Sequence, residues 1–241
     1  MSEDIPNPSL LESPEVQNVF QIAEELVRDN KVIQTNLLFK IAKRKLKYTS
    51  EKLFSIINLL FQNKILVEGS RFTRTSILYN EYRTQIYEFI RKYPGAHFSI
   101  IKENIFGKEN NPKGSTGQFV WHLEALIKFN YLKKLEVKKY SIFLPVEMDK
   151  DLGIFFFWLR DRINYKIGNI LKNNEPLDHS KLIEETQESK GTIYYHIKTM
   201  LEYDILSSDK NEKTGKIEVW LNSEKRDLII QILKNIKESP I

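Results

Sequence analysis

The chain has no cysteine among its 241 residues. This absence excludes disulfide bridges and metal sites built from thiolates, and it is compatible with a cytosolic location. Long apolar runs are also missing, because the longest, residues 153–159, stops well short of the roughly 18 residues that a membrane span requires. The first 14 residues carry acids and prolines, which is not the pattern of a secretion signal, so we expect a cytoplasmic protein without a membrane span.

Residues that carry enzymatic chemistry are equally sparse. Histidine occurs four times, at positions 97, 122, 179 and 196, without the spacing of metal ligands. Gly107 and Lys108 lack the upstream glycine and the following Ser or Thr of a phosphate-binding loop, and residues 114–117 are too short for a dinucleotide-binding fingerprint. We therefore predict no metal site, no cofactor and no enzymatic activity, and we expect His122 and His196 to serve packing or capping.

Charge is unevenly distributed along the chain, although the formal net charge is only +5. Residues 1–30 hold seven acids and one base, a balance of −6. Residues 31–145 hold 21 Lys and Arg against 8 Asp and Glu, which gives +13, and the remainder has a balance of −2. The middle of the chain is therefore the part that we expect to face an anionic partner.

Two stretches repeat one pattern at an offset of 74 residues. Residues 115–126 and 189–200 share a Ser, a Gly, a His and every apolar position that would face a core. Each stretch follows a short helical segment and precedes two strand-like segments, which is the layout of a winged helix-turn-helix. A weaker match, at an offset of 66 residues, relates residues 56–66 to 122–132, and it predicts a third such unit at the start of the chain.

The predicted fold class is α+β, mainly α, with three tandem winged-helix units, each a helix-turn-helix plus a β-wing. We expect a disordered acidic lead-in over residues 1–14, the three units over 15–79, 80–146 and 150–222, and a C-terminal helix over 223–241. In the first unit, strands are expected at 65–68 and 72–78; in the third, one long helix is expected over 153–173 and a wing tip over 209–215.

The two repeated segments resemble the third helix and the first wing strand of archaeal winged-helix transcriptional regulators. In that family a Ser- or Thr-capped helix of the form Ser-x-Gly-Thr-Ile-x-Tyr-His-Leu leads into an apolar strand, and the resemblance covers roughly residues 80–222. It implies that Lys190, Tyr194 and Tyr195 lie on the side of the helix that faces a DNA groove. The same fold also builds subunits of the endosomal-sorting (ESCRT) machinery and general transcription factors, so it leaves the function open.

The counterparts in the second unit are Thr116, Val120 and Trp121. Helices that read DNA usually present Arg, Lys, Asn, Gln or Ser to base edges, so Val120 and Trp121 suit a protein contact at least as well. This argument depends on an exposed Trp121, because a fully buried indole has no partner to contact.

Basic side chains are densest in residues 40–47, on the expected second helix of the first unit. They form a phosphate-contact surface or, alternatively, a solvated helix face whose lysines lie along apolar surface. Together with the wings and the starts of the third helices, they give the predicted nucleic-acid-binding residues: Lys43, Arg44, Lys45, Lys47, Arg71, Arg74, Ser115, Thr116, Lys133, Lys134, Lys138, Lys139, Lys190, Tyr194 and Tyr195.

Two main hypotheses follow for the function. The first is a non-enzymatic protein that binds double-stranded DNA as a transcriptional regulator. The alternative is a tandem winged-helix scaffold for protein–protein interactions, comparable to an ESCRT-like sorting complex or a polymerase-associated subunit. RNA or anionic membrane binding through the same basic surface is a third interpretation. The C-terminal helix has a wide apolar stripe, so it either packs on the third unit or pairs with another copy in a homodimer.

Overall fold

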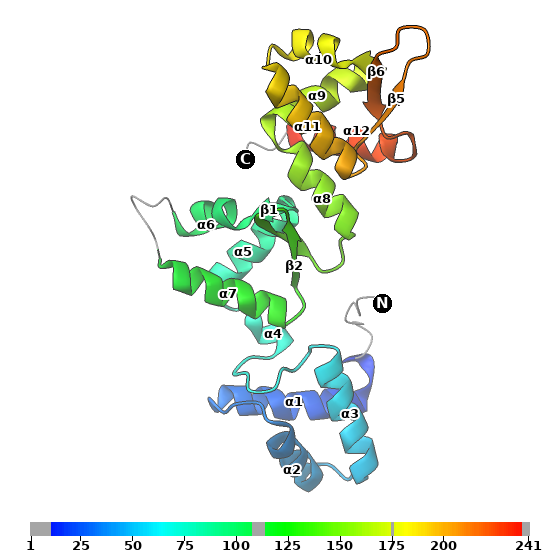
Figure 1. The fold of residues 1–241 in the computed structure, drawn as a ribbon. Coiled ribbons are helices and arrows are strands. Elements are labelled where there is room, and N and C mark those ends of the chain that lie inside the picture. Colours follow the sequence, from blue (N-terminus) through cyan, green and yellow to red (C-terminus); the bar gives the residue numbers. More distant parts are fainter. Residues whose placement is uncertain (1–10, 108–113, 175, 238–241) are drawn as a thin grey trace. The chain divides into compact units, whose positions relative to one another are not determined.

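The structure is a computed structural model that describes residues 11–107, 114–174 and 176–237 (Figure 1). It is mainly helical with small antiparallel sheets, which confirms the expected α+β class. Most of the predicted lead-in, residues 1–10, lies outside the described residues, as does the end of the predicted C-terminal helix after residue 237. Within the described part of the chain, no helix is long and apolar enough to cross a membrane.

The chain divides into two compact units. The first contains residues 1–92, 101–134 and 145–147, and the second contains residues 93–100, 135–144 and 148–241. This division passes through the predicted second winged helix, whose strands contribute mainly to the second unit. Each unit is described separately.

The first unit begins with α1 (Pro14–Arg28), α2 (Thr35–Lys45) and α3 (Ser50–Gln62). Each helix places an apolar stripe inward, and the buried residues of all three form one cluster. Thr49 begins α3 as an N-cap, because its side chain accepts a hydrogen bond from the backbone N–H of Lys52. Two ion pairs, Lys45 with Glu25 and Lys52 with Glu15, join α2 and α3 to the acidic face of α1.

The strands expected at 65–68 and 72–78 are absent, and this part of the prediction is wrong. The segment makes turns and then the short helix α4 (Arg74–Ile77), which Thr73 caps together with Ser76. Its backbone bonds instead to the α1–α2 connection: Ile33 N–H donates to Ser70 O at 2.8 Å, and Gly69 N–H donates to Ile33 O at 2.9 Å. Because these partners lie in a loop, the apolar residues 65–67 fill a core without forming a hairpin.

The rest of the first unit contains α5 (Glu81–Lys92), most of α6 (Phe98–Phe106) and α7 (Thr116–Lys128). Ser115 begins α7 as expected: its hydroxyl accepts from Gln118 N–H at 3.1 Å, and the Gln118 side chain accepts from Ser115 N–H at 3.0 Å. This reciprocal capping box satisfies two backbone donors at the start of the helix.

Two three-stranded antiparallel sheets have the same strand arrangement. The first has the order β1-β3-β2, from β1 (Ala96–His97), β2 (Leu132–Val137) and β3 (Tyr140–Pro145). The second has the order β4-β6-β5, from β4 (Leu177–Asp178), β5 (Leu206–Lys210) and β6 (Ile217–Leu221). In both, a two-residue strand directly precedes a helix, and a hairpin follows the next helix.

The long helix expected over 153–173 is in fact two helices, α8 (Lys150–Leu159) and α9 (Arg162–Asn173). The break has a clear cause, because Asp161 caps α9: its carboxylate accepts from the N–H groups of Ile163 and Asn164 at 2.9 and 3.1 Å. The remaining helices are α10 (His179–Thr186), α11 (Lys190–Glu202) and α12 (Arg226–Lys237).

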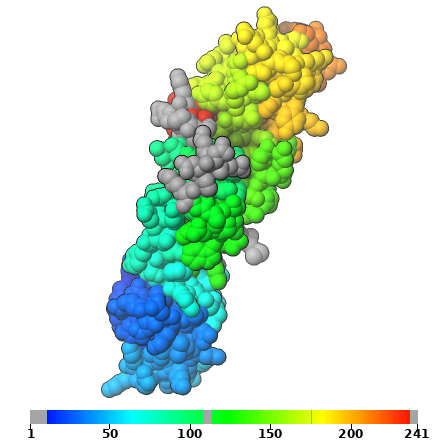
Figure 2. All heavy atoms as spheres, turned by 90° about the vertical axis from the view of Figure 1, so that its left-hand side faces the viewer, coloured from blue at the N-terminus to red at the C-terminus, as the bar shows by residue number. Residues whose placement is uncertain are grey.

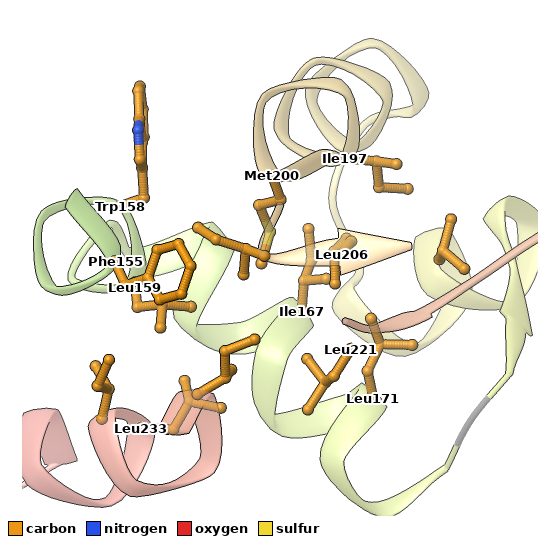
Figure 3. Close-up of a cluster of buried hydrophobic side chains, with 14 of the residues drawn as sticks. Phe155, Trp158, Leu159, Ile167, Leu171, Ile197, Met200, Leu206, Leu221 and Leu233 are labelled. Carbon is orange, nitrogen blue, oxygen red and sulfur yellow. The ribbon is translucent and has the colours of Figure 1, made fainter. Parts of the chain in front are cut away.

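The core of the second unit lies between α8, α9, α11, α12 and the β5–β6 hairpin (Figure 3). Figure 3 shows Phe155 and Leu159 of α8 facing Met200 of α11, with Leu233 of α12 below them. In the space-filling view, the yellow-green to orange residues of this unit form one closely packed body (Figure 2). Phe155 and Trp158, from the aromatic run in the second half of α8, are buried and serve packing. The apolar stripe of α12 also packs on α8 and α9, where Ile229, Ile232 and Leu233 are buried, whereas Leu228 is 36% exposed.

The glycine at position 95 has a backbone that other residues adopt only with strain. Its φ is +77°, and an added Cβ would lie 2.5 Å from the carbonyl oxygen of Gly153. Gly215 in the same unit has a similar φ of +69°, but nothing lies within 4 Å of its Cβ position. A side chain at position 215 therefore causes backbone strain alone, whereas a side chain at position 95 causes backbone strain and a steric clash.

We expect Gly215→Ala to lower the free energy of unfolding by roughly 1–2 kcal/mol, and Gly95→Ala to lower it by at least about 1 kcal/mol more. Urea denaturation followed by circular dichroism measures both, since both glycines belong to the second unit. If both variants lose the same free energy of unfolding, the Gly153 carbonyl moves away from the added Cβ without destabilising the protein.

Candidate nucleic-acid interface

The helices α10 and α11 are joined by a three-residue turn, a connection of the length found in helix-turn-helix motifs. Residues 187–189 connect the helices, and Gln187 adopts a left-handed conformation with φ of +56° that ends α10. Ser189 then begins α11 as an N-cap, because its hydroxyl accepts from Thr192 N–H at 3.2 Å. The expected cap is thus confirmed, and the turn fixes the direction in which α11 leaves α10.

One side of α11 is buried and the other faces solvent. Ile193, Ile197 and Met200 are at most 2% exposed and belong to the core. Four residues on the opposite side are exposed, and together we name them the α11 face: Lys190, Tyr194, Tyr195 and Lys198. The two tyrosines are 47% and 56% exposed, so α11 presents two adjacent aromatic side chains to solvent.

The α11 face lies beside an open groove of about 660 Å³. Its lining includes apolar and aromatic side chains of α11, Ile217 of β6, and two lysines, Lys198 and Lys216. Tyr194 stacks on His179 with a ring distance of 4.7 Å, so α10 supports the position of this tyrosine. Lys216 bonds to Asp178 at 2.8 Å, and this hydrogen bond lowers the pKa of the Asp178 carboxyl. Lys216 is therefore partly neutralised, whereas Lys198 is not paired with any described carboxylate.

The sequence prediction included Lys190, Tyr194 and Tyr195 but missed several neighbours. Lys198 follows Tyr194 at i+4, so the spacing 190, 194 and 198 already indicated one helix face. Lys210 and Lys213 are exposed on the β5–β6 hairpin, in the segment predicted as the wing tip. In the register of β5 with β6, Lys210 lies opposite Ile217, which lines the groove beside the α11 face.

The corresponding face of α7 differs in character. Thr116 is exposed at its start, Val120 is half-buried, and Trp121 is 51% exposed. The indole packs against the Arg83 guanidinium at 5.4 Å, and the same guanidinium covers the Phe72 ring at 4.5 Å. Trp121 thus keeps the exposure that the protein-contact hypothesis requires, on the wall of a groove of about 550 Å³ that Phe72 also lines.

The basic run of α2 is only partly available to a partner. Lys43, Arg44 and Lys45 form the last turn of α2, and all are exposed. Lys43 Nζ donates to the Tyr48 carbonyl at 3.0 Å, and Lys45 is paired with Glu25. Arg44 and Lys47 have no ion pair with a described carboxylate, so they are the members of the run best placed to meet a phosphate.

Arg74 has a structural position that the sequence did not indicate. Its Nη1 donates to Phe129 O at 2.8 Å, at the end of α7, and its guanidinium lies over the Tyr131 ring at 4.5 Å. Tyr131 returns a hydrogen bond from its hydroxyl to Arg74 O at 2.9 Å. Arg71, in contrast, is exposed. We therefore leave Arg74 out of the proposed contact set.

Lysines of the β2–β3 hairpin fall into two groups. Lys138 sits at the turn with φ of +53°, and its Nζ donates to Thr199 Oγ1 at 3.2 Å and pairs with Glu202 at 3.1 Å, both on α11. The same ammonium lies 5.7 Å from the Tyr195 ring centre. Lys138 is thus held by the protein. Of the other three predicted residues, Lys133 is half-buried, and Lys134 and Lys139 are exposed.

Histidines have packing roles in α7 and α11. His196 Nδ1 hydrogen-bonds to Asn164 Oδ1 at 2.8 Å, which joins α11 to α9. His122 is 7% exposed, and burial together with the nearby Arg83 charge lowers its pKa, so it is neutral at pH 7. In residues 11–107, 114–174 and 176–237, no three His, Cys, Asp or Glu side chains are grouped as a metal site would require.

Comparison with known proteins gives one coarse indication. No protein-family model and no solved structure matches the chain. The chain is similar to an uncharacterized HTH-type transcriptional regulator of Methanocaldococcus jannaschii, with 26% identity over 171 residues. The alignment covers 70% of this chain and 38% of the relative, so the chain spans about two fifths of that protein's length. This similarity fits the resemblance to helix-turn-helix regulators.

The structural position of Arg74 predicts an effect on stability. We expect Arg74→Gln to lower the free energy of unfolding by about 1–3 kcal/mol, because it removes charged hydrogen bonds to the end of α7. Arg71→Gln removes the same charge three residues earlier and should change it by less than about 0.5 kcal/mol. Urea denaturation compares them, and equal stabilities would contradict the assigned role of Arg74.

Lys138 allows a similar comparison in the second unit. Lys138→Ala should lower the free energy of unfolding by about 1 kcal/mol, since a partly exposed ion pair and the ring contacts contribute modestly. Lys139→Ala, one residue later, should leave stability within about 0.5 kcal/mol of the unmodified chain. Thermal unfolding is the measurement. A loss for Lys139→Ala as large as that for Lys138→Ala would show that the α11 contact contributes nothing.

Proposed function

We propose that this chain is a non-enzymatic, double-stranded-DNA-binding protein of the winged helix-turn-helix kind that acts in transcriptional regulation. The observation that carries the proposal is the α11 face. It is a solvent-facing, lysine- and tyrosine-bearing surface on the second helix of a helix-turn-helix, beside a hairpin with exposed lysines. An α-helix fits the major groove of B-DNA, and Lys side chains suit guanine edges and phosphates.

The topology of the two sheets supports winged-helix units in the second and third positions. In each, the order is short strand, helix, capped helix and hairpin, which is the order of a winged helix. The α2–α3 pair adds a helix-turn-helix without a wing, because the segment after α3 forms turns and α4. The proposal is therefore two winged helices preceded by a related three-helix unit.

The start of α11 is suited to a phosphate as well as to bases. An added Cβ at Gly191 would meet nothing within 4 Å, so its backbone is open to close approach. The first N–H groups of a helix attract anions because they are unpaired and lie at the positive end of the helix dipole. Lys190 stands at this end, and the lysines of the hairpin are proposed to hold the register along the DNA backbone.

Two further features support the proposal less directly. Arg44 and Lys47 add exposed positive charge on the first unit, and they are proposed as additional phosphate contacts. The printed name of the Methanocaldococcus jannaschii relative describes a transcriptional regulator of the HTH type. The aligned region covers only 38% of that protein, so its name alone does not carry the proposal. Transcriptional regulation is proposed because the name and the α11 face point in the same direction.

A protein-interaction scaffold is the second candidate, and one observation favours it. Trp121 presents a half-exposed indole on the groove that it shares with Phe72, where a base-reading helix would present polar groups. This feature belongs to α7, whereas the DNA proposal rests on α11. The two candidate functions therefore rest on different helices. A measurement of binding to generic DNA tests the function proposed for the α11 face.

The test is a fluorescence-anisotropy titration of a 30-base-pair duplex at 50 and 200 mM salt. If six to ten phosphates are neutralised, affinity should fall about a thousandfold or more between the two salt concentrations. Lys190→Ala combined with Lys198→Ala should weaken binding and reduce the slope of log K against log salt by about 1–2, because roughly 0.9 is lost for each phosphate contact.

The matched control removes two lysines from the same unit but away from the α11 face. Lys172→Ala combined with Lys234→Ala changes the net charge equally, on α9 and α12, and should leave the slope nearly unchanged. Arg44→Ala with Lys47→Ala reports the contribution of the first unit. If folded protein does not bind DNA at 50 mM salt, or if the two lysine pairs reduce affinity equally, the α11 face is not the DNA-binding surface. Either result would favour the protein-interaction scaffold.

A further inference from the structure

A small cavity lies in the second unit, away from the α11 face. It has a volume of about 210 Å³ and is lined by residues of β1, β3, the end of α8 and the α8–α9 break. Gly95, Ala96, Arg160 and Asp161 are among its lining residues. Pockets for drug-sized ligands span roughly 300–1,000 Å³, so this cavity suits a smaller molecule.

Four of the residues that line the cavity carry aromatic rings, and these rings contact one another in series. His97 meets Tyr140 with ring centres 5.7 Å apart, Tyr140 meets Phe157 at 5.4 Å, and Phe157 meets Trp158 at 4.9 Å. All four residues line the cavity. Ring faces and edges of this kind favour a flat guest that stacks between them, since such contacts add to the area that is buried.

Arg160 is a half-buried cation whose guanidinium lies 5.5 Å from the Phe156 ring but has no counter-ion among the described residues. Its Nη1 donates to the Pro94 carbonyl at 2.5 Å, and its Nε is buried without a hydrogen-bond partner. Within the described residues it pairs with no carboxylate. Burial lowers the pKa of Arg160 to about 10, so the guanidinium is still positive at pH 7. A buried charge of this kind is costly unless an anion compensates it.

The neighbouring Asp161 does not supply that anion, because its carboxylate is engaged elsewhere. It caps α9 through Ile163 N–H and Asn164 N–H, and it lies 3.4 Å from His196 Nδ1. His97 adds no positive charge, since burial lowers its pKa below the ordinary histidine value. Arg160 is therefore the one cation at neutral pH among the described residues that line the cavity.

A second donor at the cavity also lacks a partner. Trp158 is 7% exposed, and its indole Nε1 has no hydrogen-bond acceptor among the described residues. Unpaired buried donors reduce stability, by about 1–3 kcal/mol in typical cases. A carboxylate accepts up to about four hydrogen bonds and matches a guanidinium in geometry, so one group satisfies the charge and the missing acceptors together.

We propose that this cavity is a binding site for a small, flat, aromatic carboxylate of about the size of benzoate. Its carboxylate pairs with Arg160, and its ring lies among His97, Tyr140 and Phe157. The site is independent of the DNA-binding proposal, because it shares no residue with the α11 face.

The first experiment is isothermal titration calorimetry of the full chain at pH 7 with benzoate and, separately, with benzamide. Benzamide has nearly the same shape but no charge. Benzoate should bind saturably with a Kd of about 1 mM or tighter, and benzamide should bind at least about tenfold more weakly. Absence of saturable benzoate binding, or equal affinity for benzamide, would overturn the proposal without the need for any variant.

Two variants then locate the site. Arg160→Met keeps the length of the side chain and removes the charge, so benzoate affinity should fall at least about tenfold. Arg162→Met is the control: Arg162 lies two residues later with its side chain 75% exposed and paired with Glu188, and its loss should change affinity less than about twofold. Unchanged affinity in folded Arg160→Met would reject this cavity as the site. If Arg160→Met does not fold, Arg160→Lys, which keeps the charge, should retain binding, and complete loss there would also count against the assignment.

Discussion

The second unit depends on one buried amide, the side chain of Asn164. It is 0% exposed, its Nδ2 donates to Trp158 O at 2.8 Å, and its Oδ1 meets His196 Nδ1 at 2.8 Å. An amide oxygen only accepts, so His196 carries its proton on Nδ1. These two bonds fix the end of α8, the start of α9 and the middle of α11 relative to one another. The α11 face lies on the last of these helices, and the aromatic cavity borders the end of α8 and the α8–α9 break.

Local features of the fold were predictable because they depend on a few adjacent residues. The repeated Ser-x-Gly pattern located the N-caps at Ser115 and Ser189, and helical spacing located the buried face of α11. The missing first hairpin and the α8–α9 break were not predictable in this way. The first depends on Ile33, more than thirty residues away, which supplies the backbone partners that a strand would otherwise need. The second depends on Asp161 acting as a cap inside an otherwise continuous apolar pattern.

The role of charged residues in the candidate site was equally difficult to predict from the sequence. A lysine in the sequence does not reveal whether its partner is a phosphate or a carboxylate of the same chain. Lys138 binds Glu202 and Lys45 binds Glu25, whereas Lys198 and Arg44 remain accessible. The contrast between the acidic first 30 residues and the basic middle is explained in part by ion pairs of α1 with α2 and α3. Net charge therefore overstates the surface that is available for DNA, and the position of each ammonium is the more informative quantity.

The aromatic cavity and the α11 face are linked by contiguous side-chain contacts. Trp158 lines the cavity, Lys138 lies 5.2 Å from the Trp158 ring, and the same ammonium lies 5.7 Å from the Tyr195 ring on the α11 face. Continuity of contact is a necessary basis for coupling but not a sufficient one, because a ligand shifts an equilibrium only by its different affinity for two states. Within this series Lys138 is the side chain that contacts both the Trp158 ring and α11, where it binds Thr199 and Glu202. Any coupling of the cavity to the α11 face along these contacts therefore passes through this lysine.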